Sequence, residues 1–255
     1  MIFDSHAHYD DKAFDDDRAE ILASLPQLGV CSVLNAGTNI SASEKSVELS
    51  NKYSYIYAAV GIHPECISEC DYKDLEILKN LSQNEKVVAI GEIGLDYHYS
   101  AENKELQKDF FEKQILMAND VSLPILVHDR DAHMDTLNLL KEHKPKGVVH
   151  CFSGSMEMAE EILKLGMFIG VGGVVTFKNA KKLIDVVREI PLECILLETD
   201  APYMAPTPFR GKRCDSSYIK FTAQKIAEIK NKSYEEVLQK TRLNAESLFN
   251  VEVPL

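Results

Sequence analysis

Eight short apolar segments alternate along this chain with longer amphipathic segments, and this alternation most limits the possible folds. The apolar segments are rich in Val, Ile, Leu, Ala and aromatic residues, as buried strands are, and lie near residues 2–6, 31–36, 56–61, 87–92, 124–128, 147–151, 168–172 and 195–199. Helical patterns lie between and after them, near residues 16–28, 41–51, 72–82, 102–120, 132–142, 156–165, 179–189, 216–230 and 233–248. Strands that alternate with helices form parallel βαβ units.

Eight such units in 255 residues predict a (β/α)8 TIM barrel of the α/β class, with an open doubly wound sheet as the main alternative. We expect a single domain over residues 1–255, because no Ser/Gly-rich linker or low-complexity tract interrupts the alternation. The Pro-rich segment 201–214 follows the last predicted strand, and we interpret it as an ordered loop of the active site.

Charge and cysteine content limit the class of protein further. The chain carries 28 basic and 40 acidic side chains, and this net charge of −12 argues against extensive binding of nucleic acid. Divalent ions would invert the charge locally at a carboxylate-rich site. The six cysteines form no Cys-x-x-Cys pair, and the sequence contains no apolar run of about 20 residues. We also expect no signal peptide, because the first residues include no basic stretch followed by an apolar run. These features favour a cytoplasmic protein without a membrane segment.

Histidines and carboxylates stand at the ends of five of the predicted strands. In a (β/α)8 barrel the reactive groups lie at the C-terminal ends of the strands, so these side chains would meet at one mouth. The candidate metal ligands are His6, His8, Glu92, His128, His150 and Asp200. Each has an ordinary explanation when taken alone, such as a chance His-x-His pair, a core histidine or a turn, but five strand ends together are hard to explain in that way.

The first predicted strand carries His6 and His8 two residues apart, so both imidazoles, together with Asp4 before them, can face the mouth. This pair would hold one divalent ion. Glu92 lies between Gly91 and Gly94 at the predicted end of its strand, and its two oxygens can bridge two ions.

The later strands complete the predicted centre. His128 and His150 each follow apolar residues at equivalent positions, and they would hold the second ion. Asp200 would ligate the first ion and orient or deprotonate the attacking water, with Glu198 in support. Asp200 and Glu92 are therefore the candidate catalytic residues. Mixed histidine and carboxylate ligands suit two divalent ions, either Zn²⁺ or Mn²⁺, or Mg²⁺ at the oxygen-rich end.

As an ordered set, five stretches resemble the TatD family of metal-dependent deoxyribonucleases. They are residues 4–8 (DSHAH), 60–64 (VGIHP), 91–96 (GEIGLD), 150–154 (HCFSG) and 198–202 (ETDAP), so the resemblance extends over nearly the whole chain. It implies a TIM barrel of the amidohydrolase-like group, divalent metal held by the six candidate ligands, and 3′-to-5′ exonuclease action on DNA, often single-stranded. Some relatives are linked instead to deacylation of D-aminoacyl-tRNA.

Three residues are candidates for substrate contacts. His63 resembles the phosphate-contacting histidine of the family, and the alternative is a simple turn histidine. Arg130 would pair with a phosphate oxygen, or else with Asp129 or Asp131. Arg210 belongs to the basic cluster 210–213, whose three cations would hold a polyanion at the mouth, or else form a solvated loop.

The sequence therefore predicts a divalent-metal-dependent hydrolase, and in the first place a 3′-to-5′ exodeoxyribonuclease that cleaves phosphodiester bonds with a two-metal-activated water. Its expected partner is the 3′ end of single-stranded DNA. The same site would also hydrolyse a carboxyl ester, as in D-aminoacyl-tRNA deacylation, so ester and phosphodiester hydrolysis stay open as alternatives. A non-catalytic metal-binding scaffold is a third interpretation, against which the intact ligand set argues.

Overall fold

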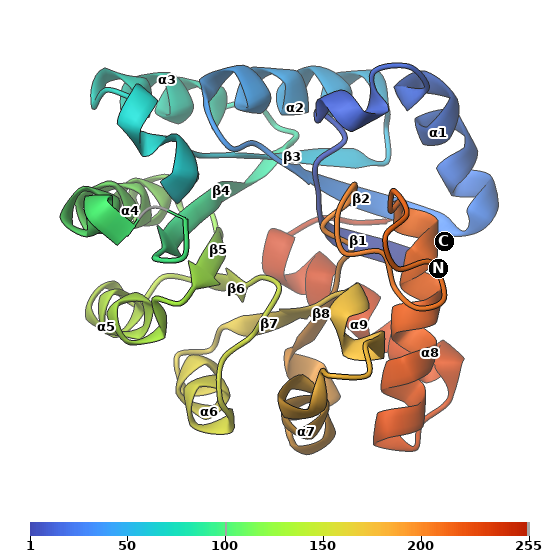
Figure 1. Cartoon of the computed structure of the whole chain (residues 1–255). Coiled ribbons are helices and arrows are strands. Elements are labelled where there is room, and N and C mark those ends of the chain that lie inside the picture. Colours follow the sequence, from blue (N-terminus) through green and yellow to red (C-terminus); the bar gives the residue numbers. More distant parts are fainter. Residues whose placement is uncertain (100, 254–255) are drawn as a thin grey trace.

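The computed structural model describes residues 1–99 and 101–253 and shows a ring of helices around an eight-stranded barrel (Figure 1). The strands are parallel and pair in chain order from β1 to β8. A bridge between Ala7 and Ala201 and a 2.9 Å hydrogen bond from Asp200 N to His6 O join the exit of β8 to β1. The barrel is thus nearly closed, which confirms the predicted (β/α)8 fold and excludes the open doubly wound sheet.

The strands and helices lie within a few residues of most predicted positions. The strands are β1 (Ile2–Ala7), β2 (Val30–Ala36), β3 (Ile56–Val60), β4 (Val87–Asp96), β5 (Ile125–Arg130), β6 (Gly147–Val149), β7 (Phe168–Val171) and β8 (Ile195–Leu197). The helices are α1 (Arg18–Ser24), α2 (Ile40–Lys52), α3 (Lys73–Leu81), α4 (Lys104–Val121), α5 (His133–His143), α6 (Met156–Lys164), α7 (Lys181–Glu189), α8 (Ile219–Lys230) and α9 (Tyr234–Phe249). None of them, within the described residues, is long and apolar enough to cross a membrane.

Two predicted elements differ from the structure. The helix expected over residues 16–28 is α1 followed by a 3-10 turn over Leu25–Leu28, because Pro26 has no N–H with which to continue an α-helix. The strand expected to end at Glu92 continues to Asp96. Glu92 therefore lies in the middle of β4, and the prediction that it ends its strand was wrong.

The two glycines beside Glu92 explain that error, because they permit close strand contact instead of ending the strand. A Cβ atom added to Gly91 would lie 2.5 Å from the Cβ of Leu126, and one added to Gly94 would lie 2.0 Å from the backbone oxygen of His128. Both contacts are too short for any side chain. β4 and β5 can therefore approach each other only because these two positions are glycine.

Alternate strand residues face opposite sides of the barrel wall. The inward residues pack against one another along the barrel axis and include Leu34, Ala59, Leu126, Val148 and Leu196. At the bottom of the barrel, the ring of Phe249 from α9 stacks on that of Phe3 at a centroid distance of 6.0 Å. The interior below the mouth is thus filled with apolar side chains, as in other barrels of this class.

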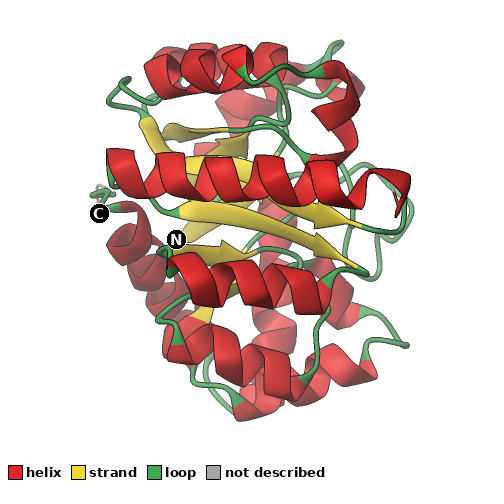
Figure 2. Ribbon diagram, turned by 90° about the vertical axis from the view of Figure 1, so that its left-hand side faces the viewer, coloured by secondary structure: helices red, strands yellow, loops and turns green. Residues whose placement is uncertain are grey.

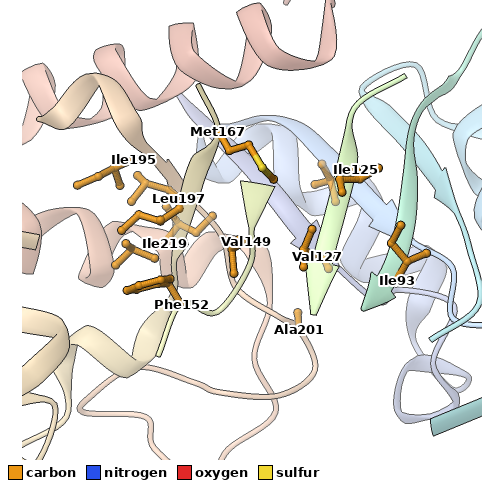
Figure 3. Close-up of a cluster of buried hydrophobic side chains, with 14 of the residues drawn as sticks. Ile93, Ile125, Val127, Val149, Phe152, Met167, Ile195, Leu197, Ala201 and Ile219 are labelled. Atoms are coloured by element: carbon orange, nitrogen blue, oxygen red, sulfur yellow. The ribbon is translucent and has the colours of Figure 1, made fainter. Parts of the chain in front are cut away.

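The outward residues of the same strands pack against the helices. Ile125, Val127 and Val149 belong to this second apolar layer, which Figure 3 shows between the strands and the surrounding elements. Seen from the side, the helices lie over the outer face of the sheet (Figure 2). The same alternation continues along the strands toward the mouth of the barrel. His128 follows the inward residue Leu126 by two positions, and His150 follows Val148 by two. Polar side chains at the strand exits therefore reach the mouth.

We expect Gly94→Ala to lower the free energy of unfolding by more than about 2 kcal/mol, because the new Cβ adds a clash with the backbone of β5 to an unfavourable positive φ of 147°. Gly29→Ala is the matched control, since Gly29 also has a positive φ, of 86°, but nothing lies within 4 Å of its added Cβ. It should cost about 1 kcal/mol. Urea denaturation followed by circular dichroism measures both losses, and equal losses would contradict the close-contact explanation.

Candidate metal centre

The six predicted ligands converge at the mouth of the barrel around the carboxylate of Glu92. They come from β1 or the residue after it, from the middle of β4, from β5 and from the turns after β6 and β8, and are His6, His8, Glu92, His128, His150 and Asp200. Their possible ligand atoms, with one from His63, form three overlapping groups in which all atoms lie within 4.8 Å of one another. The sequence thus identified residues that the fold brings together.

One oxygen of Glu92 faces the histidines of β1. Glu92 Oε2 lies 3.3 Å from His6 Nε2 and 3.4 Å from His8 Nε2. Asp200 Oδ1 lies 3.4 Å from the same His8 nitrogen and 3.9 Å from that of His6. Two imidazoles and two carboxylates therefore surround one point, a set that suits a divalent ion of the zinc or manganese type.

The other oxygen of Glu92 faces histidines from the opposite part of the barrel. Glu92 Oε1 lies 2.8 Å from His150 Nε2, 2.9 Å from His128 Nδ1 and 3.4 Å from His63 Nε2. The carboxylate is buried and stands between two groups of imidazoles, which meet where the rings of His6 and His150 stack at a centroid distance of 3.9 Å. Its geometry is that of a group able to bridge two cations.

A local irregularity of β4 places Glu92 in this position. Between Ile90 and Ile93, β4 has one residue more than the paired segment of β5, which extends from Ile125 to Val127. This bulge frees the backbone of Glu92 from regular pairing with β5, and its N–H donates instead to Gly37 O after β2, at 2.8 Å. Bulges of this kind redirect a side chain, here toward the barrel axis.

The imidazoles of His8 and His128 each form a hydrogen bond through the nitrogen that points away from the centre. This bond determines whether the nitrogen that faces the centre has a free lone pair. His8 Nδ1 lies 2.9 Å from Ala36 O, and a carbonyl oxygen can only accept, so the proton of a neutral His8 is on Nδ1. His128 Nε2 lies 3.0 Å from Asp96 Oδ2 and donates to that carboxylate. The inward nitrogens, Nε2 of His8 and Nδ1 of His128, are thus free to bind a cation.

His63 shows the reverse arrangement. Its Nδ1 accepts a hydrogen bond from the N–H of Glu65 at 3.2 Å, so a neutral ring carries its proton on Nε2. That N–H points toward Glu92 Oε1. His63 is therefore arranged as a hydrogen-bond donor at the centre, which suits contact with an anion better than ligation of a metal.

Asp96 is a functional residue that sequence reasoning missed, although it belongs to the motif of residues 91–96. Its Oδ1 accepts the N–H groups of His98 and Tyr99, each at 2.8 Å, while Oδ2 accepts from His128. Burial alone would raise its pKa, but the His128 imidazole and the two N–H donors lower the pKa of Asp96 to about 2. A permanently ionised Asp96 fixes the orientation of His128. Its signal in the sequence was its even spacing from Glu92, which on a continuous strand means the same face.

Asp4 supports the centre from below instead of joining the ligands. It is fully buried, and its carboxylate accepts hydrogen bonds from the Thr199 hydroxyl at 2.6 Å and from the Thr199 N–H at 3.0 Å. Asp200, the next residue, has a φ of 61°, a left-handed conformation that aspartate tolerates better than most residues. Asp4 thus fixes the seam between β1 and β8 from which Asp200 projects.

Glu198 supports the turn that carries His150. Its Oε1 accepts the N–H of Cys151 at 2.5 Å and lies 3.9 Å from His150 Nδ1. The carboxylate occupies space that a side chain at position 170 would fill, since a Cβ on Gly170 would lie 2.2 Å from Glu198 Oε2. Burial raises the pKa of Glu198 to about 8. Its position beneath the ligands agrees with the supporting role predicted for it.

The electrostatics of the centre favour cations. Burial would raise the pKa of Glu92, but the imidazoles of His150, His63 and His6 and the hydrogen bond from His128 hold it well below its ordinary value. Burial also opposes charge on His128, yet the carboxylates of Asp96 and Glu92 raise its pKa to about 10. Protons shared among these groups neutralise the carboxylates, and a divalent ion would displace them. The donor set fits bound divalent metal.

The centre lies in a cleft of about 750 Å³, large enough for a small organic ligand. His63 and Arg130, two of the predicted substrate contacts, line this cleft. Arg130 forms no ion pair within the described residues, because Asp129 pairs with His133 and Asp131 with His98. The guanidinium of Arg130 is therefore available to a substrate.

The basic cluster of residues 210–213, which was predicted to hold a polyanion at the mouth, makes other contacts in the structure. Arg210 is not among the described residues that line the cleft, and its guanidinium lies over the ring of Phe177 at 4.3 Å. Arg213 pairs with Asp17 at 2.5 Å. The structure thus does not bring Arg210 to the metal centre, and its contact with substrate stays a prediction.

A (β/α)8 barrel with buried histidine and carboxylate ligands at its mouth is the architecture of a metal-dependent hydrolase. The sequence model of the family "TatD related DNase" matches residues 3–250. The metal-dependent hydrolase YabD of Bacillus subtilis is 43% identical to this chain over 254 residues, which cover 98% of the chain and 100% of the relative. YcfH of Escherichia coli, also a metal-dependent hydrolase by name, is 36% identical over 99% of the chain and 97% of its own length.

Solved structures agree with these sequence matches. The crystal structure of YJJV, a TatD homologue from Escherichia coli, has a TM-score of 0.93 and 33% identity over 98% of both chains. A hydrolase of the TatD family from Entamoeba histolytica has a TM-score of 0.87 and 27% identity over 97% of both. The chain belongs to the TatD family and is a metal-dependent hydrolase.

We expect Asp96→Asn to weaken one metal site selectively. The amide oxygen of the variant would keep the N–H groups of His98 and Tyr99, so the amide NH₂ would face His128 Nε2 and force the His128 proton onto the inward Nδ1. Loss of such an outer partner typically costs about 10- to 100-fold in metal affinity. Calorimetric titration with Mn²⁺ measures the effect. Asp131→Asn, the same change at an exposed carboxylate beside His98, is the control and should bind as the wild type does; unchanged binding by Asp96→Asn would contradict the tautomer assignment.

Proposed function

We propose that this enzyme is a phosphodiesterase that removes nucleotides from the 3′ ends of single-stranded DNA. The observation that carries the proposal is the position of Glu92, whose two oxygens face different histidines within one cleft. Two divalent ions held a few ångströms apart would stabilise the charge on the attacking and leaving oxygens of a phosphodiester. His6, His8 and Asp200 would hold one ion, His128 and His150 the other, and Glu92 both.

Asp200 has the properties of a base for the attacking water. Burial would raise its pKa, but the hydrogen bond and the charge of His8, with the charges of His150 and His6, lower it, so Asp200 is ionised at neutral pH. Its side chain is 17% exposed, whereas that of Glu92 is 5% exposed. Asp200 is thus the more accessible carboxylate, and it would accept the proton of the water that attacks phosphorus.

Two donors in the cleft suit a phosphate group. The Nε2–H of His63 and the guanidinium of Arg130, which pairs with no carboxylate of residues 1–99 and 101–253, both reach the cleft and would bind the non-bridging oxygens of a substrate phosphate. The reacting group of a carboxyl ester is neutral and gives Arg130 no charge to bind, whereas that of a phosphodiester is an anion. This difference favours a phosphodiester over an aminoacyl ester as the substrate.

The charge and size of the cleft favour the end of a single strand. Its carboxylates and the net charge of −12 oppose the long electrostatic contact that duplex binding needs. A cleft of about 750 Å³ accommodates one or two nucleotides rather than a groove-length segment. The 3′ polarity and the preference for DNA rest on the family resemblance and on the description of the matching family as a DNase.

We expect purified enzyme to shorten a 5′-labelled single-stranded oligonucleotide stepwise, with loss of activity in chelator and recovery when Mg²⁺, Mn²⁺ or Zn²⁺ is restored. A 3′-labelled copy should release labelled mononucleotide at once. Asp200→Asn should reduce cleavage by at least about 1,000-fold while the circular dichroism spectrum stays unchanged, because the base for the attacking water is lost. Glu65→Gln, at an exposed carboxylate of the same cleft, is the control and should retain activity.

Three outcomes would contradict the proposal in different ways. Full activity of Asp200→Asn would remove its assigned role. Shortening from the 5′ end would reverse the polarity. No cleavage by metal-loaded wild-type enzyme would exclude a deoxyribonuclease, and hydrolysis of D-aminoacyl-tRNA under the same conditions would then identify the centre as an ester hydrolase.

A further inference from the structure

Two tyrosines at the mouth of the cleft are exposed although most large apolar side chains of this protein are buried. Tyr99 is 60% exposed and Tyr203 is 52% exposed, and both line the cleft that holds the metal centre. Neither ring contributes to the apolar core of the barrel. Exposed aromatic rings at a binding cleft are typical of contact with a ligand.

The two tyrosines stand on opposite sides of the metal centre. Tyr99 follows β4 and Tyr203 follows β8, and in a ring of eight strands these two are four places apart in either direction (Figure 1). Tyr99 lies on the side of His128, and Tyr203 on the side of Asp200. The Glu92 carboxylate, where the scissile phosphate would lie, is between the two sides.

Each tyrosine is fixed to the centre by its backbone. The N–H of Tyr99 donates to Asp96, the same carboxylate that orients His128. The N–H of Tyr203 donates to Asp200 O at 2.8 Å. The backbone of each tyrosine is thus anchored beside the metal centre, while its side chain stays accessible.

The contacts of the two rings leave aromatic surface free. The guanidinium of Arg130 lies over the ring of Tyr99 at 4.5 Å and the ring of His98 forms a T-shaped contact with it at 4.7 Å, yet Tyr99 is still 60% exposed. The hydroxyl of Tyr203 donates to Asp11 Oδ2 at 2.9 Å, which restrains the ring by its edge. A planar base would stack on such rings with little loss of side-chain freedom.

Because the cleft has few cations, stacking on aromatic rings would be an important source of affinity for a nucleic-acid strand. Besides the histidines, the described lining residues include only two cations, Arg130 and Lys182. They also include carboxylates outside the metal ligands, at Asp10, Asp11, Glu65 and Asp129. Attraction of phosphates by basic side chains, the usual source of affinity for DNA, is therefore weak here, and stacking does not depend on charge.

We infer that Tyr99 and Tyr203 are base-stacking residues that hold the two nucleotides on either side of the scissile phosphate, an inference that rests on the proposed phosphodiesterase function. Stacking on tyrosine accepts all four bases, so the enzyme would shorten strands of any sequence. The two rings set the span of the substrate across the Glu92 carboxylate. They position the phosphodiester between the two groups of metal ligands without touching the reacting atoms.

The test combines tyrosine variants with substrates that lack one base. Three single-stranded oligonucleotides are compared: one intact, one with a stable abasic unit at the 3′-terminal position, and one with that unit next to it. On the intact strand, Tyr99→Ala and Tyr203→Ala should each raise KM about tenfold with little change in kcat. Each Ala variant should have the wild-type KM on one of the two abasic strands, because the base that its tyrosine would hold is already missing there. This should be one abasic strand for Tyr99→Ala and the other for Tyr203→Ala.

The controls separate stacking from general damage. Tyr99→Phe and Tyr203→Phe keep the rings and should stay within about twofold of the wild-type KM. Tyr72→Ala removes a tyrosine that is 48% exposed but does not line the cleft, and it should have wild-type kinetics. The circular dichroism spectra of all variants should match that of the wild type.

An equal cost of Tyr99→Ala and Tyr203→Ala on intact and abasic strands, or an equal effect of the Phe and Ala variants, would overturn the stacking assignment while leaving the nuclease function in place. Absence of cleavage of the intact strand by the wild-type enzyme would instead contradict the proposed function, and with it this inference. The two failures are therefore distinguished by the wild-type lane alone.

Discussion

The arrangement of the site depends on one buried carboxylate, that of Glu92, which two groups of imidazoles share. A carboxylate this deep in an apolar barrel would be costly to ionise without partners of opposite charge. Histidines from or just after β1, β3, β5 and β6 supply those partners, at distances of 2.8 to 3.4 Å. The two oxygens point to different groups of imidazoles, which is the arrangement that the proposed two-metal centre needs. The bulge in β4 and the nearby glycines, Gly91 and Gly94, both serve to place the Glu92 side chain.

The residues around the candidate metal ligands determine the geometry of the centre as much as the ligands themselves do. Asp96 holds His128, the carbonyl group of Ala36 holds His8, and Asp4 holds the segment from which Asp200 projects. The first two contacts decide which ring nitrogen carries the proton and which faces the centre with a free lone pair. Because a neutral imidazole has one donor and one acceptor nitrogen, the outer contact makes an inward nitrogen either a metal ligand or a hydrogen-bond donor. In the proposed function, His8 and His128 would thus bind cations and His63 an anion, although all three are histidines.

The sequence predicted the fold and the main members of the site because both follow from simple periodicities. His128 and His150 each stand two residues after an inward apolar residue, so strand alternation alone places them at the mouth. The mid-strand position of Glu92 could not be predicted in this way, since Gly94 is equally typical of a turn and of close strand contact. The role of Asp96 depends on the pairing of β4 with β5, which no local pattern specifies. The exposure of Tyr99 depends likewise on how a loop leaves the barrel.

The central claim, that Glu92 joins two metal sites, is tested most directly by electron paramagnetic resonance of the enzyme loaded with two equivalents of Mn²⁺. Two ions bridged by one carboxylate are magnetically coupled, so we expect the wild-type enzyme to give the broad multiline spectrum of a dinuclear centre. Glu92→Gln should convert this spectrum to the signals of isolated ions or abolish it. A spectrum of uncoupled Mn²⁺ in the wild-type enzyme at two bound ions per chain would contradict it. Saturation of the protein at one ion would contradict it equally.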